Sequence, residues 1–156
     1  MTLEQLGNIG EFIASLGLLF SIALLVLELR HSRKLAKVNG TEARAQQWLE
    51  WRRLLINPEY ADVFRRGSTQ LDSLSETEFA VYDALMNERM VIILRMFVRS
   101  KELGDREEYE QARGNLIDQF RMWPGAVQWW NKRRKSYRTY FREFVDETLD
   151  EAKQDT

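Results

Sequence analysis

The sequence predicts an all-α protein: one N-terminal transmembrane helix followed by a small helical bundle. Three observations lead to this fold class. An uncharged apolar run occupies residues 12–27, apolar residues recur at helical spacing through the rest of the chain, and no segment alternates as a strand would. We therefore divide the chain into residues 1–37, a membrane anchor with a basic flank, and residues 38–156, a cytoplasmic helical domain.

The predicted span covers about residues 9–29. Glu11 and Glu28 flank its uncharged centre, FIASLGLLFSIALLVL. About 21 residues at 1.5 Å per residue give roughly 30 Å, the thickness of the hydrocarbon core of a bilayer. The length and composition therefore predict a single-pass membrane protein in contact with the lipid bilayer.

The basic flank predicts the orientation of the span. Arg30, Arg33, Lys34 and Lys37 follow the apolar run, whereas only Glu4 and Glu11 precede it. A secretory signal peptide has its basic residues before the apolar core, so this segment reads as an uncleaved anchor. Because positive charge stays in the cytoplasm, we expect the N-terminus outside, the C-terminus inside, and the four basic side chains against lipid headgroups.

A stripe of small residues runs along the predicted span. Gly10, Ala14, Gly17 and Ser21 follow one another at spacings of three and four, which places them on one helical face. Small residues at such a face let membrane helices approach closely, so the stripe predicts a homo-oligomer interface. The alternative is that the stripe packs against nothing.

The same register continues beyond the membrane as an apolar seam. Leu35, Val38, Leu49 and Ile56 lie on it, so one helix can run from the span to about Ile56, with Asn39-Gly40 as the point where it can break. In a second interpretation the seam is the face that this helix turns toward its own domain.

Glu28 and His31 form a Glu-x-x-His step beside the span. One histidine cannot complete a metal site within one chain, so we predict no metal. In a ring of subunits the pair would repeat around an axis and could bind or select ions. The simpler interpretation is a solvated glutamate paired with Arg30 or Lys34.

The remaining helices follow from caps and helical spacing. We expect helices over 41–56, 59–66, 76–103 and 106–122, then a short helix after Pro124 and a final one around 140–149. Gly67 is expected to end the second of these, and Ser75 and Glu78 form a capping box for the third. Arg89 lies inside that helix, where an ion pair is the expected role and a functional pocket the alternative.

Aromatic residues and a basic run lie together near the C-terminus. Trp129 and Trp130 precede Lys132-Arg133-Arg134-Lys135. Such a combination can sit at a membrane interface or stack on bases. The same sequence is also explained by tryptophans in the core beside a solvated charged face, and we prefer that interpretation.

The composition excludes several classes of function. The chain has no cysteine and one histidine, and it lacks the glycine-rich phosphate and dinucleotide motifs, so we predict no enzyme, no catalytic residue and no cofactor. Of its 23 basic and 24 acidic residues, four basic and three acidic ones lie in 1–37, which leaves 19 and 21 in the domain. That balance argues against nucleic-acid binding.

Several motifs resemble those of a set of uncharacterised bacterial single-span membrane proteins with a cytoplasmic helical domain. They are Asn57-Pro58-Glu59, Leu74-Ser75-Glu76-Thr77-Glu78, Phe141-Arg142-Glu143-Phe144-Val145-Asp146 and, most specifically, the Pro-Gly-x-x-x-Trp-Trp element of residues 124–130. The resemblance spans nearly the whole chain. It implies the architecture and a bacterial inner-membrane location, and it implies no activity.

We therefore interpret the protein as a membrane-anchored, self-associating helical scaffold that displays its domain to a protein partner of unknown identity. The alternative is a homo-oligomeric pore or ion-binding assembly with Glu28 and His31 at its cytoplasmic mouth.

Overall fold

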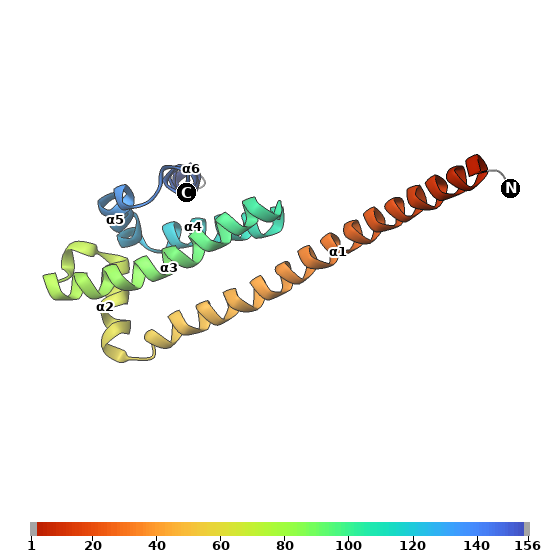
Figure 1. The fold of residues 1–156 in the computed structure, drawn as a ribbon. Helices are drawn as coiled ribbons and strands as arrows, with labels where there is room; N and C mark the ends of the chain where they lie inside the picture. The colour runs from red at the N-terminus through yellow and green to blue at the C-terminus, as the bar shows by residue number, and fades with distance from the viewer. Residues whose placement is uncertain (1–2, 155–156) are drawn as a thin grey trace. The chain divides into compact units, whose positions relative to one another are not determined.

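The computed structural model describes the backbone of residues 3–154 and the side chains of residues 15–154. The described chain is helical throughout and contains no strand, which confirms the predicted fold class (Figure 1). The elements are α1 (Leu3–Leu54), α2 (Pro58–Thr69), the 3-10 turn η1 (Leu71–Ser73), α3 (Glu76–Leu103), α4 (Arg106–Met122), α5 (Pro124–Arg133), the 3-10 turn η2 (Arg134–Ser136) and α6 (Thr139–Gln154).

Helix α1 is continuous through Asn39 and Gly40, the pair at which the sequence analysis allowed a break. Its segment from Ser15 is long and apolar enough to cross a membrane, with a mean hydropathy of 1.4 over an 18-residue window that is not buried. The chain divides into two compact units, residues 1–42 and 43–156. The last three turns of α1 therefore belong to the second unit, which we call the helical domain.

The helical domain is built around α3. This helix is apolar around much of its circumference, and its buried side chains include Tyr82, Met86, Met90, Ile93 and Phe97. Further core residues come from α4 and α6, which pack with α3 to enclose them: Ala112, Leu116, Phe120, Phe141, Phe144, Val145 and Leu149. Tyr140, also in α6, is exposed.

Both ends of α3 are capped, and the cap at the N-terminal end is the predicted one. The Ser75 hydroxyl accepts a hydrogen bond from the Glu78 amide, and the Glu78 carboxylate accepts one from the Ser75 amide, which completes the capping box. The Arg66 guanidinium also binds this carboxylate and, with Ser75, lowers the pKa of Glu78 to about 2. At the other end Gly104 adopts φ 63°, the left-handed conformation in which glycine is unstrained.

Gly67 does not end α2, because the helix continues to Thr69. Gly67 is instead a packing residue: a Cβ on it would lie 2.5 Å from the ring of Tyr82. Across from it, a Cβ on Gly125 would lie 1.8 Å from the Gly67 carbonyl oxygen. The two glycines thus allow the backbones of α2 and α5 to touch, and neither position can accept a side chain without displacement.

The two adjacent tryptophans of α5 are core residues. Trp129 and Trp130 are fully buried, and their indole N–H groups donate to Asp83 and Asp146 at 2.7 and 2.8 Å. The neighbouring Arg133 pairs with the same Asp83. Part of the basic run is therefore paired with an acidic residue at the domain surface, and the burial of both tryptophans confirms the preferred interpretation of this segment.

We expect Gly125→Ala to destabilise the domain by about 3 kcal/mol or more, because the added methyl group would overlap backbone atoms that cannot move independently. The matched control is Gly114→Ala in α4, where a Cβ meets nothing within 4 Å. That change should stabilise the domain by about 0.5–1 kcal/mol. Urea unfolding followed by tryptophan fluorescence measures both; equal effects would contradict the close contact.

Candidate functional site

The described part of the predicted oligomer stripe is open. A Cβ on Gly17 would meet nothing within 4 Å, and Ser21 is exposed. The Ser21 hydroxyl donates to the Gly17 carbonyl at 2.8 Å, so its polar group is satisfied within the helix. The side chains of Gly10 and Ala14 lie outside the described residues. Gly17 and Ser21 therefore present a small, internally satisfied surface.

The predicted ion-site and headgroup residues are exposed on α1. Glu28 and His31 lie three residues apart, and the basic side chains Arg30, Arg33, Lys34 and Lys37 are equally exposed. Among the described residues no three metal-ligating side chains gather into a cluster. The apolar seam is likewise uncovered, since Leu35 and Val38 are 48% and 49% exposed and Leu49 is 54% exposed.

The most unusual polar group of the helical domain is the guanidinium of Arg89, on α3. Its central carbon lies 4.7 Å from the ring centroid of Trp48, 4.9 Å from that of Trp51 and 4.7 Å from that of Trp123. The three indoles come from α1 and from the end of α4. Arg89 is therefore enclosed by aromatic rings, which attract a cation through their negative faces.

Arg89 has one strong polar partner and no acidic one. Its Nε–H donates to Gln119 Oε1 at 2.7 Å, and Gln119, on α4, is fully buried with its own Nε2 unpartnered. Among the described residues no carboxylate forms an ion pair with Arg89, so the expected ion pair is absent. Burial, and secondarily the charge of Arg52, lowers the pKa of Arg89 to about 10, so it stays charged at neutral pH.

A second buried group joins three helices near this cation. The Glu108 carboxylate of α4 is 6% exposed and binds both Arg99 of α3 and Arg44 of α1, the latter at 3.3 Å. Arg99 makes two hydrogen bonds to it, whereas Arg44 makes one longer contact. Glu108 thus holds the Arg44 side chain in place while neutralising mainly Arg99.

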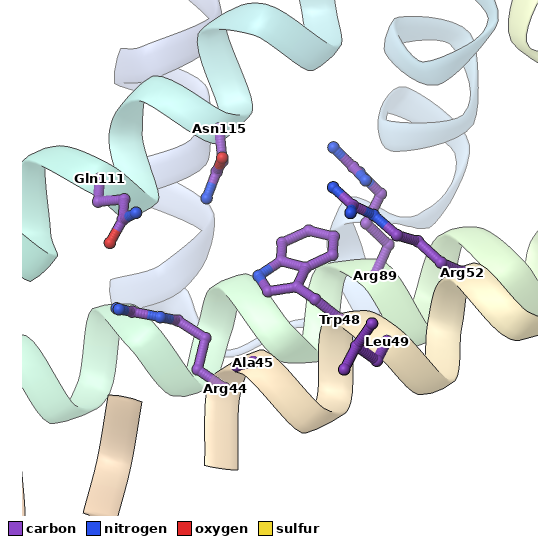
Figure 2. A pocket seen from close by; sticks show the side chains of 8 residues that line it. All are labelled: Arg44, Ala45, Trp48, Leu49, Arg52, Arg89, Gln111 and Asn115. Carbon is purple, nitrogen blue, oxygen red and sulfur yellow. The ribbon is translucent and has the colours of Figure 1, made fainter. Parts of the chain in front are cut away.

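These elements surround a cavity of about 480 Å³. Its walls consist of eight residues, and Figure 2 shows Gln111 and Asn115 extending from α4 toward the side chains that α1 and α3 supply. They are Arg44, Ala45, Trp48, Leu49, Arg52, Arg89, Gln111 and Asn115, which we call the arginine pocket. The volume falls within the range of about 300–1,000 Å³ that is typical of small-molecule sites.

The arginine pocket offers N–H donors and apolar surface. Three guanidinium groups and two carboxamides line it, and such groups bind carboxylates, phosphates and sulfates. No family model, curated protein or solved structure matches this chain. The geometry itself is therefore the guide to what the pocket binds.

The sequence analysis named a functional pocket at Arg89 as the alternative to an ion pair, but it gave the other lining residues no role in a pocket. Arg44 and Arg52 of α1 line the pocket, and Trp51, which is 5% exposed, supplies one of the rings around Arg89. The spacing of Trp48, Trp51 and Arg52 at three and four residues was an available signal. Nothing in the sequence, however, indicates that α3 and α4 meet this face of α1.

We expect Gln119→Leu to destabilise the domain by about 1–3 kcal/mol, because it leaves the Arg89 Nε–H buried without an acceptor. The double variant Arg89→Met/Gln119→Leu should regain most of that loss, since no polar group then remains at this position. Gln111→Leu, an exposed pocket residue, should change stability by less than about 0.5 kcal/mol. Additive effects in urea unfolding would contradict a coupled pair.

Proposed function

We propose that the protein is a single-span membrane protein that self-associates through α1 and displays the helical domain to a protein partner in the cytoplasm. One observation carries this proposal: the charge-free part of α1 is exposed along its described length. Its role is that of a scaffold or interaction protein rather than a catalyst.

Exposure of the large apolar residues supports the membrane anchor. Leu18, Leu19 and Phe20 are 64%, 64% and 66% exposed, and seven further apolar side chains up to Leu29 are more than 40% exposed. Removing each such side chain from water stabilises by about 1.5–3 kcal/mol. A bilayer offers that transfer on every side of the helix at once, which a partner on one face does not.

The basic flank supports the proposed orientation, with the N-terminus outside and the helical domain in the cytoplasm. Arg30, Arg33, Lys34 and Lys37 are exposed, and basic side chains at this position next to a span are attracted to anionic headgroups. The resemblance carried by Pro124–Trp130 supports placing the protein in a bacterial inner membrane, among single-span proteins with such a domain.

The absence of native cysteine allows a direct topology test. A cysteine in place of Thr2 should react with an impermeant maleimide from outside intact cells, whereas one in place of Gln154 should react only after permeabilisation. The reverse pattern would contradict the orientation. Labelling at both positions in intact cells would contradict a closed membrane between them.

The open surface at Gly17 supports self-association. Because a Cβ there meets nothing within its own chain, Gly17→Leu should leave the monomer intact and separate neighbouring helices. We expect weaker crosslinking in membranes for Gly17→Leu and unchanged crosslinking for the control, Leu18→Ala. Equal oligomer populations for the two variants, or a monomer by native mass spectrometry from nanodiscs, would count against the stripe.

A second proposal is a homo-oligomeric pore or ion-binding assembly. It is favoured by the exposure of both Glu28 and His31 on α1, since a ring of subunits would gather these groups around one axis. Cation flux into liposomes should then fall in Glu28→Gln. An absent flux, or one that this change leaves unaltered, would eliminate the pore.

A further inference from the structure

The arginine pocket contains positive charge that the domain itself does not neutralise. Arg52 and Arg89 both line the cavity, and neither forms an ion pair with a carboxylate of the described chain. Arg44, the third, shares Glu108 with the more tightly bound Arg99. We propose that this pocket binds a phosphomonoester dianion, independently of how α1 assembles.

The two unpaired guanidinium groups act on one another. The charge of Arg52 helps to lower the pKa of Arg89, so the two cations repel within the unliganded domain. Like charges held close together are unfavourable unless an anion lies between them. A bound dianion removes this repulsion and replaces the water that Arg89 loses on burial.

The charge of the ligand distinguishes a phosphomonoester from a carboxylate. A phosphomonoester carries about −1.5 to −2 at pH 7 and offers three acceptor oxygens, whereas a carboxylate carries −1 and offers two. Two unneutralised guanidinium groups match the former in charge. The carboxamides of Gln111 and Asn115 can supply further N–H donors on the α4 side of the cavity (Figure 2).

The size and lining of the pocket indicate an organic ester rather than phosphate alone. The cavity of about 480 Å³ exceeds what a single anion fills, and Ala45, Trp48 and Leu49 give part of its wall an apolar character. The phosphate binds the arginines, and the organic part of the ligand lies against this apolar wall.

Phenyl phosphate and benzoate are matched probes, because they share a ring and differ in the anionic group. Isothermal titration of the full chain, in nanodiscs of zwitterionic lipid, should give binding of phenyl phosphate and weaker binding of benzoate. Arg52→Gln should weaken phenyl phosphate by about tenfold or more, the effect of one charge-assisted contact. Arg52 is exposed and unpaired, so this variant should fold normally.

The control is Arg53→Gln, which removes the same charge from the neighbouring, exposed position outside the pocket. It should leave the affinity within about twofold, since surface charges act weakly at a distance in salt. Equal losses in the two variants, equal binding of benzoate and phenyl phosphate, or no binding of phenyl phosphate would overturn the proposal.

The same phosphomonoester could be a soluble metabolite or a lipid headgroup. Nanodiscs containing phosphatidic acid distinguish the sources. If phosphatidic acid competes with phenyl phosphate in the wild-type protein and this competition is lost in Arg52→Gln, the phosphomonoester site is supported and its ligand is a lipid. Undiminished binding of phenyl phosphate supports the assignment and makes it soluble.

Discussion

The contact between the backbones of α2 and α5 at Gly67 and Gly125 is the constraint on which the helical domain depends. It fixes α2 close to α3, where Tyr82 packs over Gly67. It also sets the position of Phe64, whose ring meets Trp51 and Trp123 edge-on at 5.4 and 5.1 Å. These two indoles flank Arg89, so the position of Arg89 in the arginine pocket depends on a contact that only glycine permits.

The charged side chain of Arg89, enclosed by aromatic rings, contributes little to the stability of the folded domain. Buried charge is unfavourable unless it is paired, and here aromatic faces and one amide oxygen take the place of a carboxylate. Hydrophobic side chains of similar volume would fill the same space without that penalty. A charge retained under such conditions is typical of a functional site, where local stability is given up for recognition.

Local signals in the sequence were sufficient for the helices but not for the way they meet. The capping box at Ser75 and the left-handed end at Gly104 depend on neighbouring residues, and the sequence predicted the capping box and the end of α3 at residue 103. Gly67 is a glycine like Gly104, but it is a packing residue, because the backbone of Gly125, which is far away in the sequence, lies against it. The arginine pocket escaped prediction for the same reason: its donors come from α1, α3 and α4, and no spacing within one helix records that they converge.

The membership of the last turns of α1 in the helical domain bears on how that domain can be isolated. The Asn57-Pro58 break looks like a natural cutting point for a soluble fragment, yet a chain beginning there would lack Trp51. The indole of Trp51 donates to the Leu85 carbonyl at 2.9 Å in the core, and its loss would remove this hydrogen bond and leave Phe64 without its edge-on aromatic neighbour on α1. A fragment intended for crystallisation must therefore begin before Arg44 and keep the end of the long helix.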